Sequence, residues 1–444
     1  MDFLSGLAAI TLLFAGAYFT IRFRAFYIVH PIKTVRSFNR DGIKQMLLSL
    51  GGTVGVGNIS GVAVAIMLGG AGAVFWMWVG AFFAMALKYA EITLGMLDKK
   101  GAAYYIRQSL GTVAAASFSV LLLSDAIMMG GVIQSSAIAE SAKTAFSVSP
   151  IVCGIFVSLF AAVIFFFKVD LFKFSAYVVP FMSVAYTVAA FSVIISFSSG
   201  IPLAFEKIFS GAFSLESASG GALGFLFTPA ARQGIVKGLF SNEAGCGTAP
   251  TAHAASSEKV PARQGLFGAF EVFVDTVVMC TLTALVILVT LGEDLSEIGG
   301  GGTNICTRAF EALFGSAAPP MISAFVFLFA FSAIISFGYY GTEICNSDKS
   351  KNLFLICYSV SVFCGATVAP MIVWRIADAV ICAMLLINTS AVLLQRKRIL
   401  KAHKEFYSHI GKYSHKAVRR VSFSVDSTKN EIPISDTDTK RGSI

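Results

Sequence analysis

The chain has few charged residues for its length. Only 13% of its 444 residues are Asp, Glu, Lys or Arg, whereas soluble domains carry about 25%. Hydrophobic residues make up 56% of the chain. Apolar runs of about 18 to 25 residues, each long enough to cross a hydrocarbon core, recur from the N-terminus to about Leu394. This composition excludes an ordinary soluble protein and predicts a chain whose main solvent is lipid.

Motifs for metal binding, redox chemistry and catalysis are also lacking. The eight cysteines form no CxxC pair, so neither a disulfide framework nor a zinc site is indicated. The five histidines form no metal-spaced cluster, and no HExxH or GxSxG motif occurs. We therefore expect no enzyme and no organic cofactor. The net charge of +9 lies mainly in loops and tail, where membrane topology explains it better than a nucleic-acid partner.

The apolar runs predict eleven membrane-spanning helices in an all-α protein. Their expected positions are near 3–21, 44–66, 72–96, 114–145, 149–167, 174–198, 222–254, 263–290, 321–345, 352–369 and 371–395. A basic segment at 21–43 follows the first helix, and because positive loops stay in the cytoplasm, we place the N-terminus outside. An odd number of crossings then places the C-terminus in the cytoplasm.

The transmembrane domain is expected to cover residues 1–398. The cytoplasmic tail at 399–444 is basic and is expected to be disordered, because from about Val421 onward it lacks the apolar residues needed to fold. Its positive charge could bring it onto anionic membrane lipids.

Two glycine-rich segments interrupt the apolar runs, at 51–61 (GGTVGVGNISG) and at 241–250 (SNEAGCGTAP). Each interior glycine costs a helix about 1 kcal/mol, so both segments should unwind. Lipid cannot satisfy the freed N–H and C=O groups, which must therefore face a cavity or a ligand. Half-helix N-termini suit a carboxylate, and freed carbonyls suit a cation. Close helix packing is the alternative reason for the glycines.

Five helices begin at each break, which divides the chain into repeats at 44–198 and 222–395. Because five is odd, the second set must be inserted upside down relative to the first. Such inverted repeats are typical of secondary transporters whose site lies between the repeats.

Several charged side chains lie within the apolar spans, where each costs about 2.5 to 3.5 kcal/mol on insertion scales. Lys88 and Glu91 are one turn apart and are expected to pair with each other. Glu243 lies beside the second break, where a role in gating or in supporting the site is plausible. Glu271 and Asp275 also need partners or water.

Three uncharged polar residues could reach the site. Gln134 could enter the cavity or make an interhelical hydrogen bond. Ser332 and Ser336 are one turn apart and could offer oxygens to a hard cation. Alternatively, each serine hydroxyl bonds the backbone of its own helix.

At these residues the sequence resembles the alanine or glycine:cation symporter family, also called the sodium:alanine symporters. The resemblance is carried by 53–59 (TVGVGNI), 69–78 (GGAGAVFWMW), 88–91 (KYAE), 238–253 (GLFSNEAGCGTAPTAH), 263–266 (RQGL), 270–275 (FEVFVD), 339–341 (YYG) and 374–378 (WRIAD). It covers most of the membrane domain.

The resemblance implies a LeuT-like five-plus-five inverted repeat with one extra N-terminal helix. It also implies alternating access with sodium-driven uptake of alanine or glycine. The substrate would lie against Thr53, Gly55, Val56, Gly57, Asn58, Gln134, Asn242, Gly245, Cys246, Gly247 and Thr248. Sodium would lie near Val56, Ser332 and Ser336, and the roles of gating or support would fall to Glu243, Lys88, Glu91 and Asp275.

The sequence departs from the family pattern at four positions. Val56 stands where the family has Thr, Gly131 and Ser136 stand where it has Asn, and Ala333 replaces a Thr that would offer an oxygen ligand. Sodium binding and the shape of the pocket are therefore less secure than the fold. A proton-coupled symporter or exchanger of the same fold, a non-transporting amino acid sensor and a channel are the alternatives.

Overall fold

The computed structural model describes residues 2–38, 40–213, 228–295, 298–299, 301–367 and 371–408, and all regular secondary structure within them is helical. Seven helical stretches among them are long and apolar enough to cross a membrane. The four other predicted spans are the two broken helices, the 17-residue α9 and the 18-residue α19. All eleven predicted spans thus correspond to a helix or to a broken pair, although residues 222–227 of the seventh and 368–369 of the tenth lie outside the described ranges.

The first six spans begin with α1 (Asp2–Arg22). The first repeat then contains α4 (Arg40–Thr53) with η1 (Val56–Asn58) and α5 (Ser60–Gly69), α6 (Gly72–Asp98), α7 (Ala102–Asp125) continued by the π-helix η2 (Ala126–Ile133) and α8 (Gln134–Phe146), α9 (Pro150–Phe166) and α10 (Leu171–Ser196).

The second repeat has the same order. It contains α13 (Pro229–Asn242) with α14 (Ala249–His253), α15 (Pro261–Val272) continued by the π-helix η5 (Phe273–Cys280) and α16 (Thr281–Thr290), α18 (Ala318–Ile344), α19 (Asp348–Gly365) and α20 (Met371–Leu394). Both predicted breaks are confirmed, because each repeat opens with a helix that stops and restarts.

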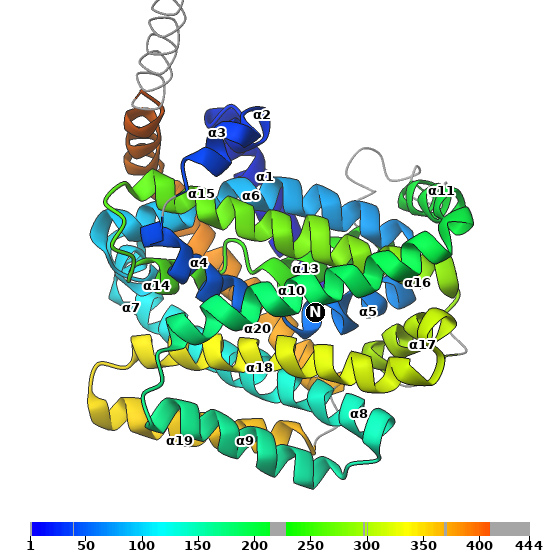
Figure 1. The fold of residues 1–444 in the computed structure, drawn as a ribbon. Helices are drawn as coiled ribbons and strands as arrows, with labels where there is room; N and C mark the ends of the chain where they lie inside the picture. The colour runs from blue at the N-terminus through cyan, green and yellow to red at the C-terminus, as the bar shows by residue number, and fades with distance from the viewer. Residues whose placement is uncertain are drawn as a thin grey trace, which may run out of the picture.

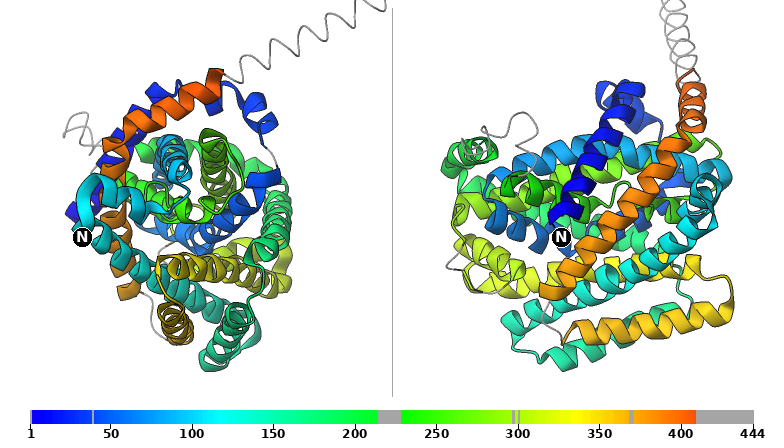
Figure 2. Two further views of the ribbon diagram at one scale, coloured as in Figure 1. Left: turned by 90° about the vertical axis from the view of Figure 1, so that its left-hand side faces the viewer. Right: turned by 180° about the vertical axis from the view of Figure 1, so that it is seen from behind.

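Many of the long helices run side by side across the bundle (Figure 1), and the left view of Figure 2 shows many of them along their axes, while its right view shows α1 and α20 crossing the others at a steep angle. Helix α6 lies at the centre of one half and packs against α1, α13 and α15. The corresponding helices α9 and α19 lie side by side at the edge of the bundle (Figure 1). The broken helices pack against unbroken ones, α4 against α10 and α18, and α13 against α6.

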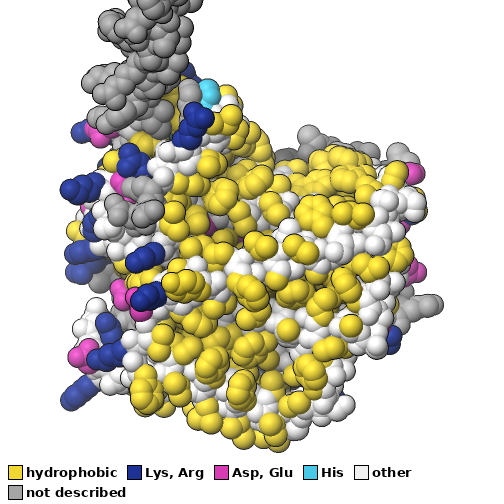
Figure 3. Space-filling view, in the orientation of Figure 1, with side chains coloured by type: hydrophobic (Ala, Val, Ile, Leu, Met, Phe, Trp, Pro, Cys, Tyr) yellow, Lys and Arg dark blue, Asp and Glu magenta, His cyan; other side chains and the backbone are white. Residues whose placement is uncertain are grey.

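The surface shown in Figure 3 is a broad field of hydrophobic side chains, with Lys and Arg gathered along one edge. Helices α9 and α10 carry many exposed apolar residues, among them Phe156, Leu159, Phe181 and Val188. Soluble proteins rarely expose apolar patches of this extent. The surface therefore fits a multi-pass membrane protein.

Several short helices were not predicted from the sequence. The loop at 21–43 contains α2 (Phe26–Val29) and α3 (Pro31–Arg36), and the connections between spans contain η3 (Ser198–Gly200), α11 (Ile201–Ala212), α17 (Gly302–Phe314) and η6 (Gly315–Ala317). Their apolar stretches are too short to span a membrane, which is why the search for long runs missed them.

The prediction of disorder is wrong for the start of the tail, because residues 396–408, here called the C-terminal helix, are helical. His403 of this helix lies with its Nδ1 atom 2.9 Å from the Tyr89 hydroxyl of α6, and its ring centroid lies 4.7 Å from that of Phe23. This aromatic contact supplies the burial that the local sequence lacks. The rest of the predicted tail lies outside the described residues.

Candidate functional site

Hydrogen bonds of Asn58 connect the first break to the second repeat. Its Oδ1 atom accepts a hydrogen bond from the Gly55 N–H at 3.1 Å, and its Nδ2 atom donates to Asp275 Oδ1 at 2.8 Å. The Asn58 carbonyl accepts from the Thr283 hydroxyl at 2.7 Å. Thr283 of α16 thus satisfies a carbonyl that the helix interruption frees, and Asp275 of η5 holds the Asn58 side chain in place.

Gln134 also reaches the first break. It is buried at the start of α8, and its Oε1 atom accepts from the Val56 N–H at 3.2 Å. The predicted interhelical hydrogen bond is therefore confirmed, with the unwound backbone as its partner. The π-helix η2 immediately precedes Gln134, and π-helical turns are frequent at functional sites.

The second break is built around Glu91 of α6. Gly245 and Gly247 have φ angles of +81° and +80°, a conformation that favours glycine. Their N–H groups donate to the two oxygens of Glu91 at 3.1 and 3.0 Å. Asn388 of α20 donates to Glu91 at 2.8 Å and to the Gly245 carbonyl at 2.8 Å. The carboxylate occupies an anion-binding turn of backbone N–H groups, so these two groups already have a partner within the protein.

Other predicted residues of the second break bond one another. Glu243 caps α13 in the left-handed region, and its Oε2 atom accepts from the Thr248 hydroxyl at 2.7 Å. Asn242 donates to the Thr276 hydroxyl at 3.1 Å. Cys246, which lies between Glu243 and Thr248 in the sequence, is a buried thiol. The break is therefore held by side chains as well as by backbone geometry.

The predicted pairing of Lys88 with Glu91 is wrong. Lys88 Nζ lies 3.4 Å from Glu271 Oε2 and donates to the Asn242 carbonyl at 2.7 Å. Helix α15 packs against α6 and brings Glu271 to Lys88, whereas the break supplies Glu91 with N–H donors from Gly245. Lys88 and Glu91 each bond residues that are distant in the sequence instead of each other.

Glu271 joins four helices of the bundle. It accepts from the Ser49 hydroxyl of α4 at 2.9 Å and lies 2.7 Å from His253 Nε2 of α14. His253 Nδ1 in turn lies 2.7 Å from Gln264 Nε2. His253 and Gln264 both lie in the family strings quoted above, but nothing in their spacing indicated that they would meet.

Ser332 and Ser336 lie against the first broken helix. The Ser336 hydroxyl donates to the Leu48 carbonyl at 2.7 Å and to the Ser332 carbonyl at 3.1 Å, so the backbone alternative is confirmed for Ser336. The Ser332 hydroxyl is buried and has no hydrogen-bond partner among the described residues. A Cβ atom at Gly51 would lie 2.5 Å from it. The absence of a side chain at Gly51 therefore leaves this oxygen directly beside α4.

Asp125 was missed as a candidate. It ends α7 where the π-helix begins, and it is 1% exposed. Its Oδ1 atom is buried without a hydrogen-bond partner in the described part of the chain. The available signal was an aspartate within the apolar run LLLSDAIMM at 121–129.

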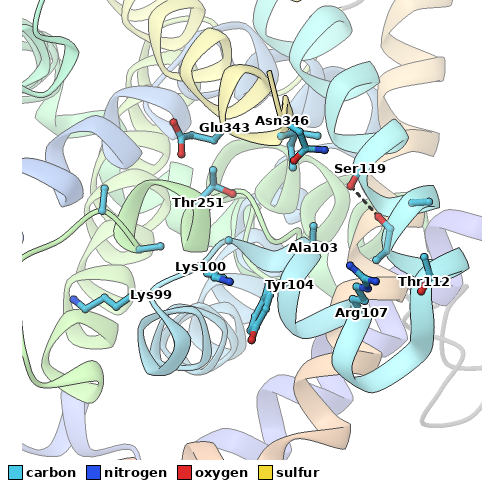
Figure 4. A pocket seen from close by; sticks show the side chains of 16 residues that line it. Lys99, Lys100, Ala103, Tyr104, Arg107, Thr112, Ser119, Thr251, Glu343 and Asn346 are labelled. Carbon is cyan, nitrogen blue, oxygen red and sulfur yellow. Dashed lines mark hydrogen bonds between the residues drawn. The ribbon is translucent and has the colours of Figure 1, made fainter. Parts of the chain in front are cut away.

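A cavity of about 650 Å³ opens at the edge where Lys and Arg gather. Figure 4 shows it between the start of α7, the end of α18 and the short half-helix α14, with Lys100, Arg107, Thr251 and Glu343 in its wall. Nearby Lys99 donates to the carbonyls of two residues in the 256–258 turn, and partial burial lowers the pKa of its ammonium. Helix α14 belongs to the second broken helix, and transporter sites are formed at such broken helices. The cavity therefore lies beside the region where the substrate site is expected.

Comparison with known proteins agrees with the resemblance. A family model described as the sodium:alanine symporter family matches residues 2–420. A probable sodium/glutamine symporter of Bacillus subtilis is 33% identical, over 98% of this chain and 95% of that protein. The sodium/alanine symporter AgcS of Methanococcus maripaludis is 32% identical, over 82% and 83%. A putative sodium/proton-dependent alanine carrier of Bacillus subtilis is 32% identical, over 82% and 81%.

Solved structures with the same architecture are far more distant in sequence. MhsT in complex with L-phenylalanine has a TM-score of 0.56 at 16% identity, over 80% of this chain and 88% of that one. A manganese transporter of Eremococcus coleocola has a TM-score of 0.54 at 11% identity, over 79% and 76%. At these identities the likeness shows the fold alone, which is the LeuT-like five-plus-five inverted repeat with one extra N-terminal helix.

Proposed function

Because the chain belongs to the sodium:alanine symporter family, and is thus a sodium-coupled amino acid transporter, we propose that its cargo is a small neutral amino acid, alanine or glycine. Transport would run into the cell by alternating access between the two repeats. The substrate would bind between the breaks, along Thr53–Asn58 and Asn242–Thr248, with Gln134 beside them.

The burial of both breaks is the observation that carries the choice of a small cargo. Every residue from Val54 to Asn58 and from Glu243 to Thr248 is buried. The N–H groups of Val56, Gly245 and Gly247 already have protein partners. Little space and few free groups then remain at the breaks, which favours a methyl group or a hydrogen atom as the substrate side chain.

The proposed sodium site lies between α4 and α18. Hard cations prefer oxygen ligands, and the unpartnered Ser332 hydroxyl supports a site at this position. Ser336 can add its hydroxyl oxygen, and Val56 can add only its carbonyl. Ala333 offers no oxygen, so this site has fewer ligands than the family pattern implies.

The proposed orientation rests on the distribution of charge. Lys99, Lys100 and Arg107 line the cavity beside α7 and α14 (Figure 4). These helices lie on the left of Figure 1, the side on which Figure 3 shows Lys and Arg gathered, and positive loops remain in the cytoplasm. We therefore assign this edge and the 650 Å³ cavity to the cytoplasmic side, with the N-terminus outside.

Purified protein in proteoliposomes tests the cargo and the ion together. Labelled alanine and glycine should accumulate under an inward sodium gradient and should not accumulate when potassium replaces sodium. If the protein took up glutamine but neither alanine nor glycine, the proposed cargo would be wrong. Binding of alanine without flux would make the protein a sensor.

Ser332→Ala tests the position of sodium. Loss of one ligand worth about 1 to 1.5 kcal/mol should raise the sodium concentration for half-maximal uptake by about tenfold. Ser323→Ala is a matched control on the same helix, because Ser323 bonds Ser141 at 3.4 Å instead of facing the break. Equal sodium dependence in both variants would rule out Ser332 as a ligand.

A further inference from the structure

The segment after α1 exposes apolar side chains outside the long spanning helices. Arg24 and Ala25 have φ angles of +55° and +45°, a left-handed conformation that is uncommon for residues other than glycine, so α1 ends in a sharp turn. Helices α2 and α3, here called the elbow, follow this turn. Large aliphatic side chains of the elbow are 39% to 67% exposed; they are Ile28, Val29, Ile32 and Val35. Such a surface is costly in water and calls for an apolar partner.

Basic side chains surround these apolar ones. Arg22, Arg24 and Arg36 are exposed, and none of them forms an ion pair within the described part of the chain. The sequence has no Asp or Glu from Ile21 to Arg40. Guanidinium groups pair with carboxylates and phosphates. Because the elbow has no acid of its own, an anion for these arginines must come from elsewhere.

The C-terminal helix extends this surface. The ring centroid of Phe26 in the elbow lies 5.5 Å from that of Tyr407 and 6.4 Å from that of Phe406. One side of the C-terminal helix is buried against the protein, and it carries Ile399, Ala402, His403 and Phe406. The opposite side is exposed and basic, and it carries Lys397, Lys401 and Lys404. Since residues three and four apart share a helix face, the helix is amphipathic, with its lysines turned away from the bundle.

Side-chain bonds hold the C-terminal helix against the ends of α6 and α7. Arg398 donates to both carboxylate oxygens of Asp98 on α6, at 3.1 and 2.8 Å, in the two-pronged geometry typical of arginine and carboxylate. Gln395, just before the helix, donates to the Tyr105 carbonyl of α7 at 2.9 Å. The lysine face therefore has a fixed position relative to the spanning helices.

The C-terminal helix lies nearly at right angles to the long helices. In Figure 1 it is the last coloured helix before the grey trace and runs upward, whereas α6 and α18 run across the picture. It lies on the side where Figure 3 shows Lys and Arg gathered. Because the long helices cross the membrane, a helix perpendicular to them at their basic ends lies along the membrane surface, as amphipathic interfacial helices do.

We propose that the elbow and the C-terminal helix together form a binding surface for anionic lipid headgroups. The aliphatic side chains of the elbow enter the boundary of the acyl chains, and the arginines and lysines contact the lipid phosphates. A soluble anion would satisfy the cations but leave Val29 and Ile32 in water. A neutral lipid would cover the aliphatic side chains but leave the cations without an anion. An anionic lipid meets both needs, and this surface is independent of the cargo and of the coupling ion.

Hydrogen exchange of the full-length protein in lipid nanodiscs tests the surface. Discs of phosphatidylcholine alone are compared with discs of equal parts phosphatidylcholine and phosphatidylglycerol. The anionic lipid should raise the protection of residues 22–38 and 396–408 several-fold and leave the middle of α18 unchanged. Salt at about 1 M, where the Debye length is about 3 Å, should remove most of this gain.

Charge variants locate the surface. Each cation near an anionic membrane contributes about fivefold in affinity, so three contribute about 100-fold. The variant that combines Arg22→Gln, Arg24→Gln and Arg36→Gln should therefore lose the gain. A matched control removes three exposed lysines outside the surface and should keep the gain; it combines Lys168→Gln, Lys173→Gln and Lys349→Gln. Val29→Ser with Ile32→Ser should reduce the gain without any change of charge.

Several outcomes would overturn the proposal. If phosphatidylglycerol protects neither segment of the wild-type protein, no such surface exists. If inorganic phosphate added to discs of phosphatidylcholine gives the same gain, the cations bind a soluble anion and the lipid assignment is wrong. Equal loss in the arginine variant and in the lysine control would show a general effect of charge instead of a defined surface. The comparison of the two lipid compositions with wild-type protein decides the matter if the arginine variant does not fold.

Discussion

Glu91→Gln replaces one carboxylate oxygen by an NH2 group, and we expect this small change to disrupt the second break. The carboxylate accepts from the N–H groups of Gly245 and Gly247 and from Asn388. A glutamine oxygen can keep the two bonds made at Oε2, but its NH2 group then faces the Gly245 N–H, donor against donor. One buried N–H is left unpaired, at a cost of about 1 to 3 kcal/mol.

That cost sets the size of the expected effect. Since 1.4 kcal/mol is a tenfold change in an equilibrium, the equilibrium constant for the intact break should fall by about 5-fold to about 150-fold. Alanine uptake should fall by a similar factor. Glu91→Ala leaves three donors unpaired, at about 3 to 9 kcal/mol, which approaches the whole stability of about 5 to 15 kcal/mol for a folded protein. We expect that variant to yield little folded protein.

Proteoliposome uptake and the thermal midpoint of the purified protein check this prediction. Glu140→Gln is the control, because Glu140 accepts one N–H, from Gly301 at 3.0 Å, and a glutamine oxygen can replace that acceptor. If Glu91→Gln transports and melts like Glu140→Gln, the carboxylate does not hold the break, and the reasoning is refuted.

Three further predictions follow from other contacts. Lys88→Met should lower the yield of monodisperse protein by leaving Glu271 in a broken buried pair, at about 3 to 5 kcal/mol, and adding Glu271→Gln should restore part of the yield. Gly247→Ala should lower the thermal midpoint because φ is +80° and a Cβ atom would collide with its neighbours, whereas Gly292→Ala, with φ +78° and open space, should lower it much less. Burial lowers the pKa of His403 to about 4, so the neutral ring stabilises the docked C-terminal helix above about pH 6.5, and this contribution is lost as the pH falls toward 4. The protection factors for hydrogen exchange in that helix, corrected for the intrinsic pH dependence of exchange, should fall over this interval in the wild type, and a similar fall in His403→Phe would refute the assignment.

The sequence alone predicted the features that depend on local composition. Long apolar runs predict spans because the bilayer thickness fixes their length. Runs of glycine predict the breaks at Gly55 and Gly245 because glycine destabilises a helix wherever it stands. The five-plus-five repeat followed from counting spans after each break. None of these predictions requires knowledge of which helices touch.

Partner choice depended on the tertiary structure. Lys88 and Glu91 are one turn apart, and local reasoning pairs them, but α15 and the second break offered each of them better partners. Gly131 was considered for the pocket, yet a Cβ atom there would lie 2.4 Å from the Ser361 hydroxyl of α19, so it faces a packed helix.

The proximity of Phe118 of α7 to Gly247 in the second break was hidden for the same physical reason. The two residues are far apart in the chain, and only the packing of α7 against the second break brings them together. Sequence periodicity reports which face of a helix is apolar, but not which distant helix covers that face. The membrane therefore fixed the helices and their breaks, while the packing between repeats decided which charges meet.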